Sequence, residues 1–386
     1  MPNPAPFFIL CALGFAAFFS SYLRIPVLPL FAASLGATPA QVGLINGAFM
    51  ITAGLFSIPA GLLVDRVGQK LPVVGGLLAI ALSSLLITLC RTPGEMTAAY
   101  LLFGTGMAAF APGMLALVAD TVPADRVGRA YGWYTTAVYL AMTLGPAAGG
   151  YLAGNAGLRR VFLISGGLLL VIALLALLLL PRGAARHKTG IQVMLTGSVE
   201  LLRNFTLTSC LLATLGSCIG FGVFLTFLPL FASGCGLDPA QVGLVFAAQA
   251  FTNVISRVPI GRLADRVDRR RIVAVGLFCL AVALATLGQA TRLPSLLGCA
   301  VLLGLGMALT YTAIGALIAD GVPPRQRGLA MGMYNSCIYL GMMAGSTGMG
   351  FALQRIGYPL GFSLAGASAL LACLAFARMS RVPEQA

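Results

Sequence analysis

Long apolar runs, separated by short polar or Pro/Gly-marked breaks, fill almost the whole chain of 386 residues. Each run has about 20 residues or more, which is what a helix needs to cross a bilayer core of about 30 Å. The first six predicted spans are 6–33, 39–64, 71–90, 96–119, 130–153 and 159–180. The second six are 205–233, 239–263, 271–290, 294–319, 328–353 and 358–377. We therefore expect an all-α polytopic membrane protein with an N-terminal half at 1–180, a linker at 181–204 and a C-terminal half at 205–386.

The two sets of spans are related by an internal repeat at a constant offset of 200 residues. LPLFAASLGATPAQVGL at 28–44 matches LPLFASGCGLDPAQVGL at 228–244 without a gap. The same offset relates Asp65-Arg66-Val67 to Asp265-Arg266-Val267, and Asp120 to Asp320. An even number of spans per half gives both halves the same orientation, so we expect parallel repeats related by an axis along the membrane normal. This plan is typical of transporters whose halves rock around a midplane site.

Composition and charge exclude other classes of protein. The chain is 59% hydrophobic and 9% charged, whereas soluble domains have about 25% charged residues. Its net charge of +14 raises the question of nucleic acid binding, but no basic helix or aromatic-basic platform is present. With the first span running outward, seventeen Lys and Arg fall on the inner side, five in outer loops and two within spans. This bias predicts that both termini are cytoplasmic and that no nucleic acid partner is needed.

Two loops carry matching charged motifs. The loop at 61–70 reads GLLVDRVGQK, and the loop at 261–270 reads GRLADRVDRR. A glycine permits close helix approach, and a carboxylate interacts with the dipoles of neighbouring helix ends. These loops resemble the signature G-x-L-a-D-r-x-G-r-k of the major facilitator superfamily, with departures at Gln69 and Asp268. With the duplication, the resemblance covers essentially the whole chain and implies the twelve-span fold of that family, closest to its drug and metabolite efflux group.

The resemblance implies that the two loops are latches that close the cytoplasmic side. Asp65 would face the amides near 328–331, and Arg66 or Lys70 would pair with Asp120. A carboxylate at a helix N-terminus contributes up to about 2 kcal/mol, which is enough to shift a two-state equilibrium. The residues assigned to the latches are Gly61, Asp65, Arg66, Lys70, Asp120, Gly261, Asp265, Arg266, Arg269, Arg270 and Asp320.

The fifth span contains a segment rich in small residues. Its residues of interest are Gly132, Ala141, Gly145, Pro146, Gly149 and Gly150. The segment resembles the family's antiporter motif, with Ala141 in place of one glycine, and this interpretation favours export. Gly145 and Gly149 form a face that lets helices pack closely, and Pro146 permits a bend. Ordinary helix packing is the alternative role for this face.

Two arginines lie within predicted spans. A central arginine costs about 2.5 to 3.5 kcal/mol on insertion scales, so Arg24 should have a partner or face a wet cavity. It is a candidate anchor for a substrate carboxylate or phosphate, and the alternative is snorkelling to the outer headgroups. Arg257 is expected to pair with Asp265 or with helix-end carbonyls, or to line the inner vestibule. All ten acids lie at span ends or in loops, so no proton carrier is visible within a span.

In the family, spans 1, 2, 4, 5, 7, 8, 10 and 11 line the substrate cavity. The polar and aromatic candidates on these spans are Arg24, Tyr22, Asn46, Tyr100, Tyr134, Tyr139, Gln249, Asn253, Tyr311, Tyr334, Asn335 and Tyr339. Tyr100 stands where proton-coupled drug exporters usually carry an arginine. Such a set suits an amphipathic or anionic organic molecule, although each residue could equally serve helix–helix hydrogen bonding.

We expect a secondary transporter working by alternating access, which exports a small organic molecule or drug. Import or facilitated uptake of an organic anion is the alternative, and a non-transporting membrane receptor, scaffold or polytopic enzyme is a third class. No metal-ligand cluster, Ser-His-Asp set or phosphate loop supports catalysis, so no enzyme activity, cofactor or metal is expected. The expected partners are a small-molecule substrate, the lipid bilayer and, as an open question, a coupling proton. A monomer in a bacterial inner membrane is expected.

Overall fold

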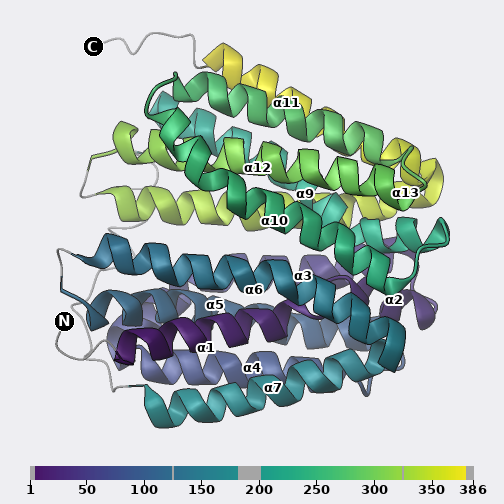
Figure 1. The fold of residues 1–386 in the computed structure, drawn as a ribbon, viewed down its shortest axis with the longest axis horizontal. Coiled ribbons are helices and arrows are strands. Elements are labelled where there is room, and N and C mark those ends of the chain that lie inside the picture. The colour runs from purple at the N-terminus through teal and green to yellow at the C-terminus, as the bar shows by residue number, and fades with distance from the viewer. Residues whose placement is uncertain (1–4, 124–125, 181–200, 324–325, 380–386) are drawn as a thin grey trace. The chain divides into compact units, whose positions relative to one another are not determined.

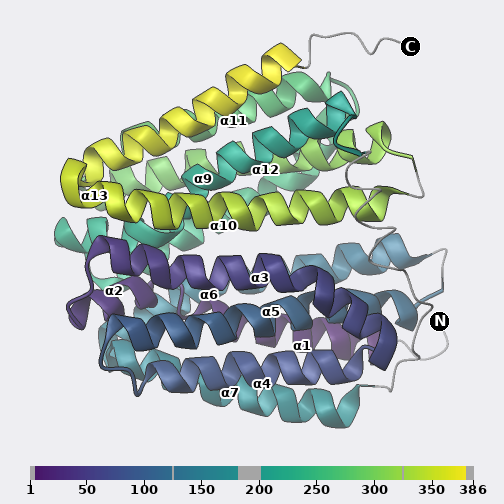
Figure 2. The ribbon, with the colours of Figure 1, turned by 180° about the vertical axis from the view of Figure 1, so that it is seen from behind.

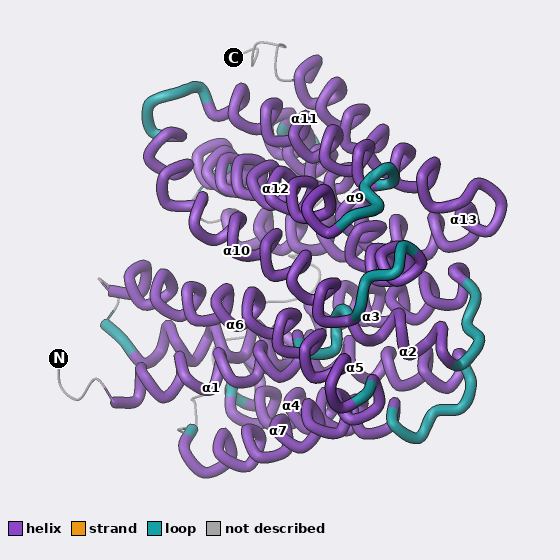
Figure 3. The backbone as a smooth tube through the Cα atoms, turned by 45° about the vertical axis from the view of Figure 1, so that its right-hand side comes forward, coloured by secondary structure: helices purple, strands orange, loops and turns teal. Residues whose placement is uncertain are grey.

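The computed structural model describes residues 5–123, 126–180, 201–323 and 326–379. In these ranges every regular element is a helix, and short loops join the helices (Figure 3). The first repeat, residues 1–180, contains α1 (Ala5–Tyr22), α2 (Val27–Ser34), α3 (Pro39–Val67), α4 (Lys70–Ile87), α5 (Pro93–Thr121), α6 (Val127–Ala156) and α7 (Leu158–Leu179). The second repeat, residues 205–386, contains α9 (Phe205–Gly234), α10 (Pro239–Ala264), α11 (Arg269–Leu287), α12 (Leu293–Gly321) and α13 (Arg327–Met379).

These helices confirm the predicted twelve-span fold. Nine stretches of the described residues are long and apolar enough to cross a membrane. One of them, Leu329–Met379, holds two spans, because Gly357 has a φ of 73° and interrupts α13. Helices α6 and α10, of 30 and 26 residues, match two further predicted spans and are not among the nine.

The first span is broken, which the sequence pattern did not predict. Residues 23–26 form a turn between α1 and α2, although the apolar run is continuous over 6–33. Pro26 has no N–H group to continue the helical ladder, and the N–H of Ile25 instead bonds to the Tyr22 carbonyl at 3.2 Å. The residue 200 positions later, Thr226, keeps its N–H, and α9 runs through this point without interruption.

Glycines set the helix crossings at equivalent places in the two repeats. A Cβ on Gly106 would lie 2.7 Å from the carbonyl oxygen of Gly76, and a Cβ on Gly306 would lie 2.9 Å from that of Gly276. Helix α4 therefore approaches α5 as closely as α11 approaches α12. Only glycine allows backbones to come this near, so the repeat seen in the sequence is also a repeat of helix contacts.

The departure at Asp268 changes the end of a helix. Gly68 has a φ of 81°, a left-handed value that glycine adopts without strain, and it ends α3 after Val67. Its counterpart Asp268 has a φ of −53° and caps α11, with its carboxylate accepting from the N–H of Arg270 at 3.0 Å. As a result α10 ends at Ala264, three residues earlier than its counterpart α3.

The chain divides by its contacts into two compact units, one of residues 1–188 with 237–247 and one of 189–236 with 248–386. Within the first unit, α5 packs against α3 and α4, while α7 packs on α4 and α6 on α1 (Figures 1 and 2). Within the second, α13 packs against α9 and α11, and α11 also packs on α12. The linker predicted at 181–204 lies outside the described residues except for 201–204.

Candidate functional site

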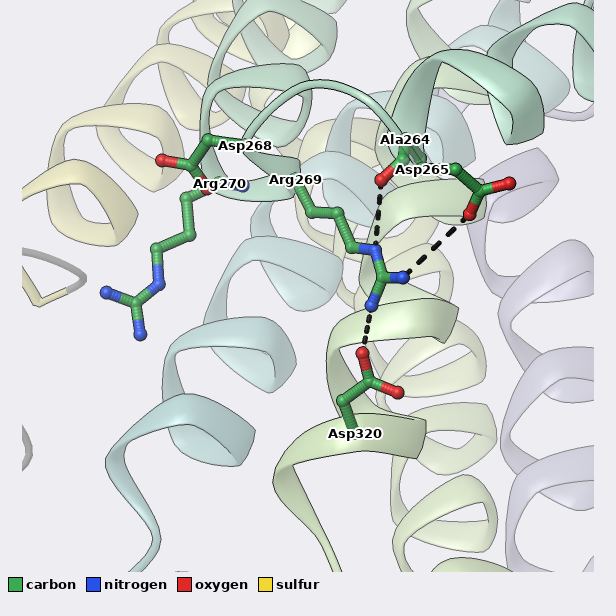
Figure 4. A network of polar contacts seen from close by, with 6 residues as sticks. All are labelled: Ala264, Asp265, Asp268, Arg269, Arg270 and Asp320. Atoms are coloured by element: carbon green, nitrogen blue, oxygen red, sulfur yellow. Dashed lines mark hydrogen bonds and ion pairs between the residues drawn. The ribbon is translucent and has the colours of Figure 1, made fainter.

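The second repeat holds a charged cluster where α10 is followed by α11. The guanidinium of Arg269 is hydrogen-bonded to the carboxylate of Asp320, at the end of α12, and its Nη2 lies 4.0 Å from an oxygen of Asp265 (Figure 4). Its Nε also donates to the Ala264 carbonyl at 3.2 Å. Arg270 points away from the cluster. The structure thus brings together three of the predicted latch residues, and the arginine ties α11 to the ends of both neighbouring helices.

The corresponding contact in the first repeat is different in kind. Gln69 Nε2 donates to Asp120 Oδ2 at 2.7 Å. Lys70, one of the two bases predicted to pair with Asp120, instead donates to the carbonyl of Leu180 at 2.7 Å. The side chains of Asp65 and Arg66, like the surroundings of Gly61, lie outside the described residues. Gln69 stands in the sequence only as a departure from the family signature, yet its side chain reaches Asp120.

Two other predicted latch residues are placed without close contacts. A Cβ on Gly261 would meet nothing within 4 Å among the described atoms, and Arg266 is exposed. Close helix approach at Gly261, expected from the motif, is therefore not seen within its unit. Arg257, expected to pair with Asp265 or with helix-end carbonyls, has its Nε bonded to Asn253 Oδ1 at 2.9 Å, one turn earlier in α10.

The antiporter-like segment of α6 packs directly on the end of α1. A Cβ on Gly145 would lie 2.7 Å from Cβ of Tyr22, and a Cβ on Gly149 would overlap the carbonyl of Leu23. Pro146 and Gly150 are buried on the same helix. Gly132 is different, because a Cβ there would meet nothing within 4 Å in the described structure. Two of the motif glycines thus support the chain next to the broken span, and Gly132 does not.

Arg24 lies in that break and is buried inside the helices of the first repeat. Its side chain is 1% exposed. Nη1 donates to Ser84 Oγ of α4 at 2.9 Å, and the guanidinium carbon lies 3.4 Å from the centre of the Phe103 ring of α5. The ring of Tyr100 is 5.4 Å away. A cation over an aromatic face at this distance contributes about 0.5 to 2 kcal/mol. The side chain does not snorkel, which was the alternative role.

Serine hydroxyls extend the surroundings of Arg24. Ser84 Oγ is 3.4 Å from Ser165 Oγ of α7, and Ser165 Oγ donates to the Ser20 carbonyl at 2.7 Å. Ser20 Oγ in turn donates to the Ser165 carbonyl at 3.1 Å. Nε and Nη2 of Arg24 have no hydrogen-bond partner among the described residues. A buried donor without a partner costs about 1 to 3 kcal/mol, and more if it is charged.

The remaining cavity candidates fall into two groups. Asn46, Gln249 and Asn253 are buried, and Gln249 Nε2 lies 3.1 Å from Met307 Sδ. The tyrosines Tyr22, Tyr139, Tyr311 and Tyr339 are partly exposed, and Asn335 is exposed. Tyr311 contacts Ser217 Oγ at 3.3 Å and Cys218 Sγ at 3.2 Å. Arg24 and Tyr100 of this set lie against one another.

Sequence reasoning missed the contacts of Arg24 with Ser84 and Phe103. It also missed Ser165, which lies next to Ser84, and Ser20, which is bonded to Ser165. A signal for them was present in the internal repeat. Their counterparts at the offset of 200 are Gly220, Leu284, Leu303 and Ala365, and the counterpart of Arg24 is Phe224. Positions that are polar or aromatic in one repeat and smaller or more apolar in the other mark the place where the two halves have diverged.

Comparisons with known proteins agree with this fold. The Major Facilitator Superfamily profile matches residues 10–238 and 210–386. The multi-drug resistance efflux pump PmrA of Streptococcus pneumoniae is 27% identical over 367 residues, covering 91% of this chain and 90% of the relative. Multidrug resistance protein 2 of Bacillus subtilis is 25% identical over 366 residues, covering 92% and 91%. An uncharacterized MFS-type transporter of Methanocaldococcus jannaschii is 25% identical over 337 residues, covering 86% and 87%.

Solved structures show the same fold at lower sequence identity. The nucleoside transporter NupG has a TM-score of 0.83 at 14% identity, covering 97% of this chain and 99% of that one. A bacterial homologue of the human lysosomal transporter Spinster has a TM-score of 0.81 at 16% identity, covering 98% and 97%. Together with the duplicated six-helix repeats and the two signature loops, the profile match over nearly the whole chain shows that this protein belongs to the Major Facilitator Superfamily of membrane transporters.

Proposed function

We propose that this protein exports a small amphipathic or anionic organic molecule by alternating access. Its curated relatives include proteins named as multidrug efflux or resistance proteins, aligned over about nine-tenths of the chain. The observation that carries the proposal is the contact of α6 with α1: Gly145 and Gly149 of the antiporter-like segment support the end of the helix that precedes Arg24. Span 1 and span 5 both line the cavity in this family, so this contact lies where the motif is expected to act.

The two loops that follow α3 and α10 are the proposed latches. In the second repeat, Arg269 joins Asp320 to the end of α10. In the first, Gln69 makes the equivalent contact with Asp120, and Asp65 is the proposed counter-group for a helix N-terminus in the other repeat. Breaking such contacts would release helix ends that must separate when the inner side opens. We further propose a monomer in a bacterial inner membrane with both termini in the cytoplasm.

The test is a paired metabolite profile of cells and medium. Strains would express the wild type, Asp65→Asn, or Glu95→Gln at matched membrane levels. Glu95 is a suitable control, because its carboxylate accepts from the N–H of Arg91 at 2.7 Å in the first turn of α5, at the opposite end of that helix from Asp120. Export predicts compounds enriched in the medium with the wild type and the control, and not with Asp65→Asn.

The same profile separates the alternatives. Compounds that accumulate inside cells with the wild type would identify an importer of the same fold and overturn the direction proposed here. Normal export by Asp65→Asn would overturn the latch. A coupling proton is tested by imposing a pH gradient on proteoliposomes, where exchange for protons predicts accumulation that collapses when an ionophore dissipates the gradient.

A further inference from the structure

The unpartnered nitrogens of Arg24 form one edge of its guanidinium. Nη1 is bonded to Ser84 and the planar face lies on Phe103. The two nitrogens without a partner among the described residues are Nε and Nη2. These two nitrogens carry parallel N–H groups that lie in the guanidinium plane, along the same edge. This arrangement can donate one hydrogen bond to each of two oxygens of a carboxylate or phosphate. The contacts that Arg24 does make therefore orient the guanidinium and leave its binding edge unused.

The surroundings of Arg24 are built in one repeat only. Arg24 and five positions around it differ from their counterparts, and each difference removes a charge, a hydroxyl or an aromatic ring from the second repeat. The pairs are Arg24 and Phe224, Ser20 and Gly220, Ser84 and Leu284, Tyr100 and Ala300, Phe103 and Leu303, Ser165 and Ala365. The second repeat folds with the same helix crossings without any of these groups. The cluster is therefore not required by the fold, which points to binding.

No acid among the described side chains of the first repeat supplies the missing counter-charge. The acids of the first repeat whose side chains are described are Asp120, near the end of α5, and Glu95, in the first turn of α5. A buried guanidinium without an anionic partner is costly, because desolvation of the charge is not offset. An oxyanion brought by a ligand would offset it and fill both free positions at once.

We propose that the Nε and Nη2 edge of Arg24 is an oxyanion-binding site, and that the transported molecule carries a carboxylate or phosphate group that binds there. This step rests on the proposed transport function. Arg24 lies in the break at 23–26, where its carbonyl accepts from the N–H groups of Val27 and Leu28 at 3.1 and 2.8 Å and α2 begins as a separate helix. The guanidinium is thus attached to a turn and not to a continuous helical ladder.

The experiment measures binding without transport. The purified full-length protein in detergent is unfolded thermally with benzoate, with its neutral isostere benzamide, with inorganic phosphate and with chloride. The fork geometry predicts that benzoate or phosphate raises the melting temperature by a few degrees and that benzamide and chloride do not. Benzoate and phosphate also distinguish a carboxylate of an organic molecule from a free inorganic oxyanion.

Two variants make the result specific to Arg24. Arg24→Lys keeps the positive charge and lacks the fork, and it should lose the shift produced by benzoate or phosphate. The double variant Arg24→Phe with Ser84→Leu is the folding control. It introduces the residues that the second repeat has at these two positions, Phe224 and Leu284. It should unfold cooperatively and show no shift.

Several outcomes would overturn the site. These are no shift with either oxyanion in the wild type, an equal shift with benzamide or chloride, or an undiminished shift in Arg24→Lys. Because binding is measured in detergent, these outcomes do not depend on transport. In the export assay, Arg24→Lys should reduce the export of acidic compounds at least tenfold more than the export of neutral compounds. An equal reduction of both would overturn the link between this site and the substrate. A failure of Asp65→Asn to affect export would reject the latch and leave the anion site standing.

Discussion

Gln69 donates to Asp120 over 2.7 Å at the place where, 200 residues later, Arg269 is bonded to Asp320. The donor to the acid is thus a neutral amide in the first repeat and a guanidinium in the second. Gln69 is 1% exposed, and its Oε1 has no partner among the described residues, whereas the Arg269 side chain is 27% exposed. The two acids, Asp120 and Asp320, are both exposed. The two contacts are related by sequence and geometry and differ in charge and solvation.

This difference predicts unequal responses to salt. An exposed ion pair is screened by added salt, and a partly buried hydrogen bond from a neutral amide is screened much less. Transport by Arg269→Gln should therefore vary less between 50 and about 500 mM salt than transport by the wild type. The measurement is the initial rate in proteoliposomes at each salt concentration. An unchanged salt dependence in Arg269→Gln would show that this ion pair does not limit the conformational change.

Gly149 and Gly132 should respond in opposite ways to alanine. A Cβ at Gly149 overlaps the carbonyl of Leu23, so Gly149→Ala must displace α6 from the broken span and should lower the melting temperature and abolish export. Gly132→Ala adds a methyl group where no described atom lies within 4 Å, and the better helix propensity of alanine should keep or raise stability by up to about 1 kcal/mol. Membrane level, melting temperature and export of both variants check this. Equal loss in both would mean that Gly132 acts through a contact outside its own unit.

Phe103 should contribute to stability through the charge of Arg24. Phe103→Leu introduces the residue of the second repeat and removes the ring from beneath the guanidinium, at a cost of about 0.5 to 2 kcal/mol beyond the lost packing. In an Arg24→Phe background that extra cost should vanish. A double-mutant cycle on thermal unfolding measures the coupling. A coupling energy near zero would show that the contact is steric only.

In the second repeat, a hydroxyl pair takes the place of two prolines. Thr226 Oγ1 lies 2.7 Å from Ser346 Oγ, which also donates to the Gly222 carbonyl at 3.2 Å. Their counterparts are Pro26 and Pro146. Ser346→Ala should destabilise the protein by about 1 to 3 kcal/mol, because it removes a hydrogen bond from the buried hydroxyl of Thr226. Adding Thr226→Val should cost less than the sum of the two single changes, as measured by thermal unfolding of the set.

The spans and the repeat could be predicted from the sequence, because both depend on patterns that extend over many residues. The observed helices begin and end within three residues of the predicted spans. The break at 23–26 could not be predicted from hydropathy, because hydropathy does not depend on whether a residue has a backbone N–H group, and Pro26 has none. A proline alone is not decisive either: Pro229 lies inside α9, which continues through it.

Individual side-chain partners could be predicted only in part. The cluster of Arg269 with Asp320 follows from the family signature. The partner of Lys70 does not, because it is the Leu180 carbonyl, 110 residues away and without any side-chain signal. The position of Arg24 within a span marks it as unusual in the sequence. Its contacts with Ser84 and Phe103 depend on which faces of α4 and α5 pack together. That information is distributed over the whole bundle.

The different helix ends at Gly68 and Asp268 have a mechanical consequence. The backbone of Asp65 belongs to the last turns of α3, so a displacement of this acid directly moves the end of that helix. Asp265 follows the end of α10 and lies in a turn. A displacement of Asp265 first changes the conformation of the turn at 265–268, and only part of it is passed on to α10. Of two acids that are equivalent in the sequence repeat, one is therefore part of a helix and the other is part of a turn.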